Sequence, residues 1–278
     1  MLAGSVLILA GIMGTALYAL RRNRRGHGVS ERAMLIGGGV LFPFVTLFAL
    51  MVWSLVGERL AAEDDPSLFQ LEARGHQFWW EFTYPDVGGA PLYGAGEALI
   101  PAGEPLLVAL ESQDVIHSFW VPRLAGKMDA IPGRTNLMRL SADAPGTYAG
   151  QCAEFCGNQH LNMRFIVHAL PAAELAARLE ALAATAPDPA LPGAADFAEH
   201  CAACHSVDPR QRGGPGPNLA ALALRSQLGG GAPYAGADDL RRWLLDHPDI
   251  KPGSRKPPTT VNHDTLDRII TYLESTRP

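Results

Sequence analysis

The chain lacks the features by which several classes of protein are recognised. Its formal net charge is only −5 over 278 residues, so it offers no electrostatic footprint for nucleic acid. Its four cysteines occur as two pairs, CAEFC and CAACH. Because each pair forms part of a ligand motif, none is left over for a structural disulfide. Methionine is absent after Met163. The cysteines therefore indicate cofactors and say little about the redox compartment.

Apolar residues are concentrated at the start of the chain. The mean hydropathy is +0.04, but residues 1–57 are strongly apolar and the rest are not. Two stretches, 2–20 and 33–56, are each long enough to cross a hydrocarbon core as a helix. The loop between them holds five arginines: Arg21, Arg22, Arg24, Arg25 and Arg32. Positive loops stay in the cytoplasm, so the sequence predicts a transmembrane hairpin over 1–60, with everything after Gly57 outside.

A cleaved signal peptide is the alternative interpretation of the first apolar stretch. A signal peptide carries its charges in front of the apolar run, whereas here they follow it, and no small-residue cleavage site stands out. The hairpin is therefore favoured. Pro43 is expected to kink the second helix, and Glu31 is interpreted as a solvated loop charge.

Residues 151–163, QCAEFCGNQHLNM, hold the densest group of metal-ligand side chains. Two thiolates, an imidazole and a thioether suit copper in electron-transfer sites: Cys152, Cys156, His160 and Met163. Two cysteines at i and i+4 allow two sulfurs to bridge two copper ions, and each copper then needs a terminal nitrogen. The second nitrogen is expected from His117, in the strand-like segment VIHSFW. A disulfide and a zinc site are the alternatives, but a disulfide does not need His160 and Met163, and zinc rarely uses methionine.

This loop resembles the dinuclear copper (CuA) loop of subunit II of haem–copper cytochrome c oxidases, Cys-x-Glu-x-Cys-x-x-x-His-x-x-Met, at every position. The segments DVIHSFWVP, KMDAIPGR and PGTYAGQCAEFCG resemble the family as well. The resemblance covers residues 66–171 closely and the hairpin more loosely. It implies that the carbonyl of Glu154 and the thioether of Met163 are weak axial ligands of different coppers.

The resemblance also implies a second metal ion at the interface with subunit I. In the family, the side chain at the position of Glu154 reaches a magnesium or manganese ion there, and oxygen ligands suit such an ion. A solvated carboxylate is the alternative. Asp129 and Arg134, in KMDAIPGR, are expected to order the same interface.

From Ser67 onward, short alternating runs separated by glycine and proline predict an antiparallel, cupredoxin-like β-sandwich over 66–171. Within it, GHQFWWEF resembles the aromatic stretch where the family commonly has a tryptophan that admits electrons from soluble cytochrome c. This chain has Phe78 at that position, followed by Trp79 and Trp80. We do not carry the docking role onto Phe78, and core packing is the alternative for all three rings.

Residues 172–192 are predicted to form a helix and an Ala/Pro-rich, semi-rigid linker, TAPDPALPG. A small all-α domain over 193–278 follows. In it, Cys201-x-x-Cys204-His205 indicates covalent haem c attachment, with zinc or redox chemistry as the alternative for the bare motif. GPNL resembles the loop in which the carbonyl of Pro217 accepts the imidazole N–H. The end of the chain resembles the closing helix of a class I cytochrome c, with one apolar face: Leu266, Ile269, Ile270 and Leu273.

The sixth ligand of that haem is open. A class I cytochrome c takes a methionine from the loop before the closing helix, and residues 193–278 contain none. In the segment KPGSRKP, Lys256 occupies the family's methionine position. His263 and His247 are the other candidates, and water is the fourth. Lys256 must be neutral to bind iron, and burial would help by lowering its pKa.

The resemblance as a whole implies subunit II of a proton-pumping oxidase with a fused cytochrome c. Electrons are expected to pass from an external donor, a cytochrome c or a quinol-oxidising complex, through haem c and copper to the haem of subunit I, which performs the oxygen chemistry. Subunits I and III and the bacterial inner membrane are the expected partners, with the copper and haem domains on the periplasmic side. The linker would replace diffusional docking by tethering the donor.

Three other functions stay open at this point. A nitric oxide reductase with a related copper subunit would use the same ligands. A membrane-anchored electron carrier would have no catalytic partner. A copper-delivery protein would need labile copper, which a bridged dithiolate pair does not favour.

Overall fold

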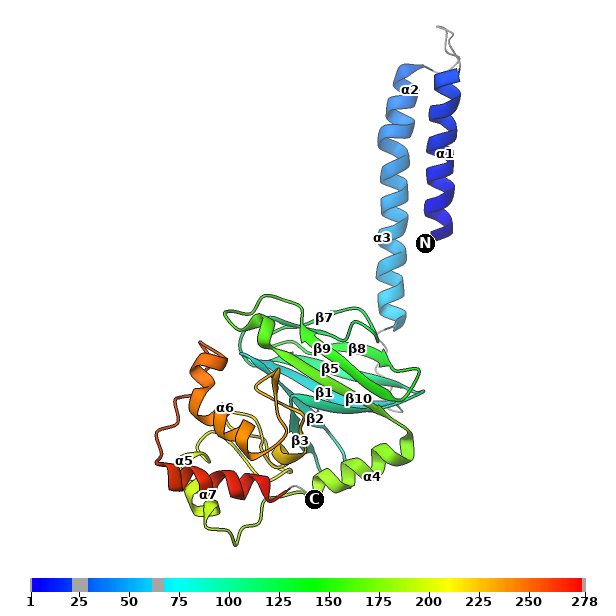
Figure 1. The fold of residues 1–278 in the computed structure, drawn as a ribbon. Coiled ribbons are helices and arrows are strands. Elements are labelled where there is room, and N and C mark those ends of the chain that lie inside the picture. Colours follow the sequence, from blue (N-terminus) through cyan, green and yellow to red (C-terminus); the bar gives the residue numbers. More distant parts are fainter. Residues whose placement is uncertain (1, 22–29, 62–67, 277–278) are drawn as a thin grey trace. The chain divides into compact units, whose positions relative to one another are not determined.

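A computed structural model describes residues 2–21, 30–61 and 68–276. The chain divides into two compact units, Met1–Leu60 and Ala61–Pro278, which are described separately. Figure 1 traces their elements in chain order.

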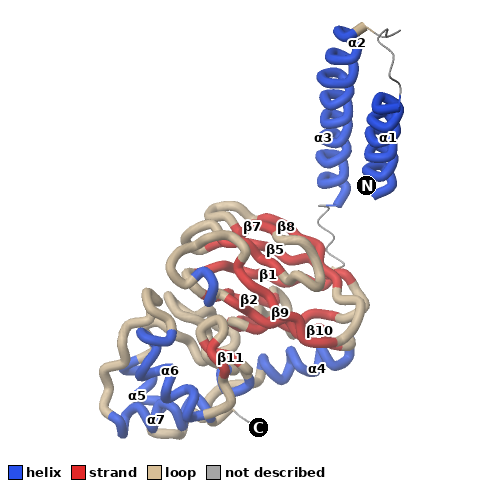
Figure 2. Tube along the Cα trace, turned by 45° about the horizontal axis from the view of Figure 1, so that its top comes forward, coloured by secondary structure: helices blue, strands red, loops and turns tan. Residues whose placement is uncertain are grey.

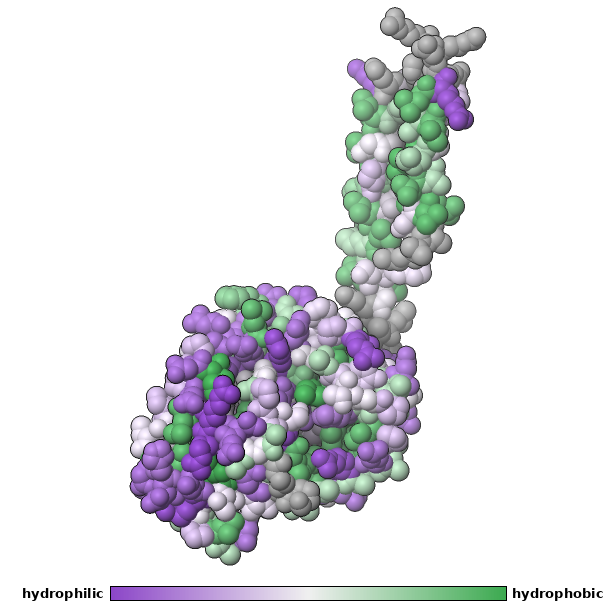
Figure 3. All heavy atoms as spheres, in the orientation of Figure 1, coloured by the Kyte–Doolittle hydropathy of each residue, from purple (hydrophilic) through white to green (hydrophobic). Residues whose placement is uncertain are grey.

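The first unit is helical. Its elements are α1 (Leu2–Arg21), α2 (Glu31–Ile36), a π-helical segment η1 (Gly37–Leu41) and α3 (Phe42–Ala61). Large apolar side chains are exposed along α1 and α3 (Figure 3), which is the pattern of helices that face lipid rather than water. The span Arg32–Gly57 contains an 18-residue window with a mean hydropathy of 2.3 and is long enough to cross a membrane, and α1 holds a shorter apolar stretch, Gly4–Tyr18. The arginine-rich loop at 22–29 lies outside the described residues, as does the side chain of Glu31.

The π-helical segment lies directly before Pro43. Proline has no N–H and its ring clashes with the carbonyl four residues earlier, so the turn before it must widen. Gly37, Gly38 and Gly39 occupy this wider turn and add no side chains that would crowd it. The disturbance expected at Pro43 takes this form.

The second unit begins with a sandwich of two five-stranded sheets. The first sheet runs in the order β3-β2-β1-β5-β8: Leu92–Ala95, Trp79–Tyr84, Phe69–His76, Pro105–Ser112 and Asn136–Ser141. The second runs in the order β4-β10-β9-β6-β7: Glu97–Pro101, Arg164–Leu170, Gly146–Cys152, His117–Trp120 and Met128–Ala130.

The cupredoxin-like sandwich predicted from the sequence is confirmed, and its sheets are mixed. Most neighbours are antiparallel, but β1 pairs in parallel with β5, and β10 with β4. Alternating polar and apolar residues show that a strand has one buried face, but they carry no information about the direction of its neighbour.

Aromatic rings fill the core between the two sheets. Trp80 meets Phe119 edge-on, with ring centroids 5.6 Å apart, and Phe119 stacks on Phe165 at 4.7 Å. A Cβ atom at Gly150 would lie 2.2 Å from the ring of Phe165, so only glycine fits opposite that ring. The same cluster reaches the base of His117, whose ring lies 6.0 Å from that of Trp80. The aromatic core therefore packs against the ring of His117.

A helix and a loop lead from the sandwich to the last domain. Helix α4 (Ala172–Ala183) buries Leu175 and Leu179 against the sandwich core. The helices of the last domain are α5 (Gly193–His200), α6 (Ala237–Ile250) and α7 (His263–Glu274), with a short 3-10 turn, η3 (Leu222–Leu224), and a two-stranded ribbon, β11 (Gln227–Leu228) and β12 (Ala232–Pro233). Figure 2 separates these helices from the strands of the sandwich.

The last domain has a core of its own. The predicted apolar face of α7 is buried, from Leu266 to Leu273, and packs with Phe197 of α5. At the crossing of α5 and α7, a Cβ atom on Gly193 would lie 2.0 Å from the carbonyl oxygen of Arg268. Glycine at this position therefore sets how closely the two helices approach.

Candidate metal centre and haem site

Neighbouring strands bring His117 and the cysteine loop together. His117 begins β6, and Cys152 ends β9, where it pairs with Phe119. The backbone of the loop is tied back to these strands, because the N–H of Cys152 bonds to the carbonyl of Met163 and the N–H of Ala153 to that of Ser118. Residues distant in sequence thus meet at one end of the sandwich.

The donor atoms of this cluster lie at distances that one or two metal ions can bridge. The sulfurs of Cys152 and Cys156 are 3.9 Å apart, far beyond a disulfide bond. Nδ1 of His117 lies 3.8 Å from the first sulfur, and Nδ1 of His160 lies 3.7 Å from the second. Two nitrogen or sulfur ligands of one tetrahedral metal stand about 3.3–3.8 Å apart, so the observed separations lie at or just above the upper end of that span.

Two weaker donors complete the cluster. Sδ of Met163 lies 3.8 Å from the sulfur of Cys156, and the carbonyl oxygen of Glu154 lies 3.2 Å from the sulfur of Cys152. His117 and Met163 are both fully buried. One weak donor therefore stands beside each sulfur, in a dry environment.

Asp114 fixes the orientation of the His117 ring. Its Oδ1 atom lies 2.8 Å from Nε2 of His117, so Nε2 carries a proton and Nδ1 faces the sulfurs. Burial would raise the pKa of Asp114, but hydrogen bonds from His117 and from the N–H groups of Gln77 and Val115 lower it to about 2. Asp114 is therefore a permanent carboxylate acceptor for the ring.

The two thiols cannot both ionise easily on their own. Their hydrogen bond lowers the pKa of Cys152, with help from His117, and it raises the pKa of Cys156. A second thiolate 3.9 Å from the first would repel it in a buried site. A cation is what allows both sulfurs to lose their protons, which is a property of thiolate metal sites.

The side chain of Glu154 points away from this cluster. It is 45% exposed, and its carboxylate lies 3.6 Å from Nζ of Lys127. Asp129 lies in β7, where its carbonyl accepts a hydrogen bond from Asn136, and Arg134 is exposed. The carbonyl of Glu154 thus lies beside the sulfur of Cys152, whereas its carboxylate lies beside Lys127.

The CAACH motif lies at the end of α5. Cys201 and Cys204 are free and partly buried, and Nδ1 of His205 lies 2.8 Å from the carbonyl oxygen of Pro217. That contact leaves Nε2 as the free ring nitrogen. Burial lowers the pKa of His205, which favours the neutral imidazole that a metal needs. A Cβ atom on Gly216 would lie 2.4 Å from Cε1 of the ring, so glycine is required beside it.

The candidates for a second nitrogen ligand fall into two groups. Nζ of Lys256 lies 3.3 Å from Nδ1 of His247, and the positive charge of Lys256 contributes to the lowered pKa of His205. His247 is buried, and its Nε2 lies 2.8 Å from the carbonyl oxygen of Lys256. His263 is the first residue of α7 and is exposed. The structure therefore brings Lys256 and His247 together and leaves His263 on the surface.

The aromatic residues after Gln77 have different surroundings. Trp80 is fully buried in the core, and Trp79 stacks on His76 with ring centroids 4.1 Å apart. Phe78 is buried as well, and its carbonyl accepts a hydrogen bond from Lys251, which follows α6. The position where the family commonly has its entry tryptophan is thus bound, at its backbone carbonyl, by the helical domain of the same chain.

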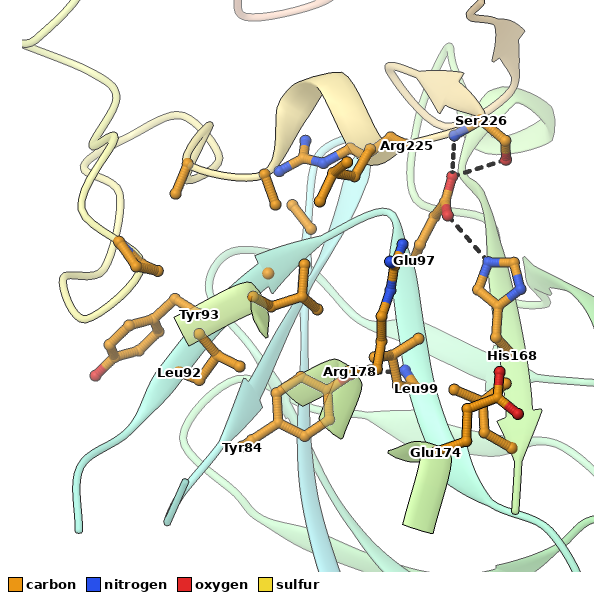
Figure 4. Close-up of a pocket in the computed structure, with 18 residues that line it drawn as sticks. Tyr84, Leu92, Tyr93, Glu97, Leu99, His168, Glu174, Arg178, Arg225 and Ser226 are labelled. Carbon is orange, nitrogen blue, oxygen red and sulfur yellow. Dashed lines mark hydrogen bonds and ion pairs between the residues drawn. The ribbon is translucent and has the colours of Figure 1, made fainter. Parts of the chain in front are cut away.

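A cavity of about 370 Å³ separates the far end of the sandwich from the helical domain (Figure 4). Glu97 of β4 lies at its wall, where one carboxylate oxygen accepts hydrogen bonds from the backbone and hydroxyl of Ser226 and the other lies 3.0 Å from Nε2 of His168. Arg225 and α4 line the other sides. The cavity holds none of the cysteine or histidine residues of the copper loop or of the CAACH motif.

Two site residues were not predicted from the sequence. Asp114 carries a signal that could have been used, since a carboxylate three residues before a ligand histidine is a common partner of its ring. Lys251 carries none, because its burial depends on how two domains pack.

Comparisons with known proteins agree with this division of the chain. A family model described as "Cytochrome C oxidase subunit II, periplasmic domain" matches residues 92–170, and one described as "Cytochrome c" matches residues 190–277.

A protein named cytochrome c oxidase subunit 2 from Alkalihalophilus pseudofirmus is 33% identical over 97% of this chain and 84% of that protein. The protein of the same name from Bacillus sp. (strain PS3) is 32% identical over 76% of this chain and 63% of its own length. A crystal structure of the periplasmic domain of subunit II of cytochrome oxidase from Bradyrhizobium japonicum is 30% identical and covers 41% of this chain and 94% of that domain, with a TM-score of 0.39.

Proposed function

The chain belongs to the cytochrome c oxidase subunit 2 family, and we propose that it carries electrons from an external donor, through a covalent haem c and a dinuclear copper centre, to the haem of subunit I. Members of this family are subunits of an oxidoreductase. The fused cytochrome c domain supports a role in electron transfer within a haem–copper oxidase. The observation that carries the proposal is the spacing of the two sulfurs and two imidazoles at the end of the sandwich.

The copper ligands follow from that spacing. Cys152 and Cys156 would bridge two ions, and His117 and His160 would each cap one. Met163 and the carbonyl of Glu154 would be weak axial ligands, one to each ion. A bound copper pair would store and release one electron at a time. The chain's own contribution is to keep the donors buried and fixed, so that little rearrangement accompanies each transfer.

A further metal ion belongs to the same proposal. The carboxylate of Glu154 is partly exposed and makes a long ion pair with Lys127, so it can turn toward a partner. A magnesium or manganese ion shared with subunit I would take that oxygen as a ligand.

The haem would be held by the CAACH motif, which follows α5, and by Pro217. Cys201 and Cys204 would form thioethers to the haem, and His205 would bind the iron through Nε2, with the carbonyl of Pro217 holding its other nitrogen. Lys256 is the sixth ligand that we propose, because it is partly buried and burial lowers its pKa.

The setting of the subunit follows from the family and from the apolar helices. Relatives of this family are membrane subunits with a periplasmic domain, and Arg32–Gly57 is apolar enough to span a membrane. We place the copper and haem domains on the periplasmic side of a two-pass hairpin, beside subunits I and III, with a cytochrome c or a quinol-oxidising complex as the donor.

The test is the metal content and electron paramagnetic resonance of the intact oxidase. We expect two coppers per chain of this subunit and a mixed-valence signal delocalised over both. Cys152→Ser and Cys156→Ser should each abolish that signal, because either change removes a bridge. Met163→Leu should leave copper bound and shift its potential, because axial ligands tune the centre. A full dinuclear signal in either serine variant would overturn the copper assignment.

A further inference from the structure

Lys251 lies in an unusual place for a lysine. It follows α6 of the haem domain, and only 4% of its surface is exposed. Among the described residues, no carboxylate lies within ion-pair distance of its ammonium group. An ammonium group is costly to bury unless its donors are all satisfied. Burial lowers the pKa of Lys251, and hydrogen bonds to backbone carbonyls oppose this by stabilising the charged form.

Three carbonyl groups surround this ammonium. Nζ donates to the carbonyl oxygen of Phe78 at 2.6 Å, to that of Asn162 at 2.8 Å and to that of Gly229. A lysine ammonium has three N–H donors, so each of them has one acceptor. Phe78 and Asn162 belong to the copper domain, whereas Gly229 belongs to the haem domain. One side chain therefore joins the two domains through a complete set of hydrogen bonds.

Both copper-domain acceptors adjoin the copper loop. Asn162 directly precedes Met163, one of the proposed axial ligands. Phe78 follows Gln77, whose side-chain amide donates to the carbonyl oxygen of Cys156 at 2.6 Å. A Cβ atom on Gly157, the residue after Cys156, would lie 3.0 Å from the ring of Phe78. Lys251 thus binds the backbone at two points that adjoin the cysteine loop.

Neighbouring residues of the haem domain reinforce the same contact. The amide of Gln159 donates to the carbonyl oxygen of Pro252 at 2.8 Å, and the N–H of Arg164 donates to that of Gly230 at 3.0 Å. The guanidinium of Arg255 reaches the side-chain oxygen of Gln77 at 3.0 Å. Lys251 is the buried centre of this contact, and the exposed Arg255 lies at its rim.

A second contact between the domains provides a natural comparison. Arg210 of the haem domain donates to the carbonyl oxygens of Val87 and Ala90, at 2.7 and 2.8 Å. These lie in the loop after β2 (Trp79–Tyr84), a strand of six residues. That loop therefore lies about 17 Å or more along the strand from Phe78. Arg210 and Lys251 both join the domains by charge-assisted bonds to carbonyls, but only Lys251 does so at the copper loop.

We propose that Lys251 is a positioning residue for intramolecular electron transfer: it holds the haem domain at one fixed place on the copper loop. The inference rests on the proposed function, since it presumes a haem and a copper pair in these domains. Without the ammonium, three carbonyls lose this donor and the contact between the haem domain and the loop is loosened. Electron transfer slows as two cofactors move apart, so a loosened contact should be visible as a slower transfer.

The experiment uses the intact oxidase complex with its metals and haems. Haem c is reduced rapidly, and the rate at which the electron appears at copper is followed by the near-infrared absorption of the copper centre. Lys251→Met should slow this step severalfold, whereas Arg210→Met should leave it close to the wild-type rate. Copper content, haem content and the copper resonance signal should match the wild type in both variants.

A partial replacement keeps the proposal testable if Lys251→Met fails to assemble. Lys251→Gln retains two N–H donors without the charge, and it should give a rate between those of the wild type and the methionine variant. Equal rates in Lys251→Met and Arg210→Met, or a wild-type rate in both Lys251 variants, would overturn the positioning role. Failure of the proposed function would look different, because the wild-type complex itself would then lack the copper signal or the covalent haem.

Discussion

At the scale of single residues, one hydrogen bond decides which nitrogen of His117 faces the sulfurs. Asp114 holds Nε2, so Nδ1 is left for a metal. We predict that Asp114→Ala weakens copper binding about ten- to a hundredfold, because the imidazole loses both its orientation and its fixed tautomer. The measurement is a copper titration of the full-length chain against a competing chelator.

Asp143→Ala is the matched control, since Asp143 is an exposed carboxylate in the same domain. It should leave the affinity unchanged. If Asp114→Ala binds copper as tightly as the control variant does, the hydrogen bond does not orient the ligand.

The sixth haem ligand is also decided by one residue. Lys256 lies in the buried group beside His247, and His263 is exposed on α7. We predict that Lys256→Ala changes the spin state of the ferric haem and that His263→Ala does not. The absorption spectrum of the intact subunit should lack the band of methionine-to-iron charge transfer, and nitrogen ligation should give a lower potential than methionine would.

The opposite pattern would identify another ligand. If the spin state changes in His263→Ala alone, His263 is the ligand and α7 must begin at a different residue. If it changes in His247→Ala alone, His247 is the ligand. A methionine band would show that a residue at or before Met163 reaches the iron.

Residues of the two motifs could be named from the sequence because ligand chemistry fixes their spacing within short segments. The i and i+4 cysteines and the CAACH motif needed no knowledge of the fold. Lys251 could not be named in this way. A lysine in the segment KPGSRKP looks solvated, and its burial arises from the carbonyls of Phe78, Asn162 and Gly229, which lie far apart in the chain.

At the scale of elements, β4 and the loop before β11 form a further link between the domains, in addition to the contacts of Lys251 and Arg210. Glu97 accepts two hydrogen bonds from Ser226 and lies 3.0 Å from His168. Burial would raise the pKa of Glu97, but these hydrogen bonds outweigh it and lower the pKa below the ordinary carboxyl value. Because the folded pKa is depressed, the stabilisation is complete above the ordinary pKa and is lost as the pH falls through the folded one.

We therefore predict that acid weakens the contact of the haem domain in the wild type more than in Glu97→Gln. At neutral pH the substitution should cost about 1–3 kcal/mol, the range of a charge-assisted hydrogen bond, and the difference should vanish at acid pH. Thermal unfolding followed by haem absorbance at pH 7 and in acid measures this. A difference that stays constant across that range would show that the charge of Glu97 contributes nothing.

The elements themselves were predictable to different degrees. Apolar stretches without charge gave the first unit, and the periodicity of residues 263–274 gave α7. Helix α6 was not predicted, since Pro248 lies inside it and its apolar face is narrow. The parallel pairing of β1 with β5 was not predictable either, because the side-chain pattern of a strand is the same for both directions.

At the scale of the whole molecule, the fused domain contacts the sandwich at the family's entry position for electrons. Phe78 stands at the family's entry position, its ring belongs to the sandwich core, and its carbonyl is bound by Lys251 of the haem domain. Tethering keeps the donor domain at a high effective concentration, so a docking tryptophan is dispensable. An external donor is therefore expected to deliver electrons to the haem domain rather than to the copper loop.

The most direct test of this account is the order in which the cofactors are reduced. The intact oxidase is mixed rapidly with its reduced external donor, and the absorption of haem c, of the copper centre and of the haem in subunit I is followed together. The account predicts that haem c is reduced first and that copper gains its electron as haem c is reoxidised. Reduction of the copper centre before haem c, or at an unchanged rate when Cys201→Ala and Cys204→Ala together prevent haem attachment, would contradict it.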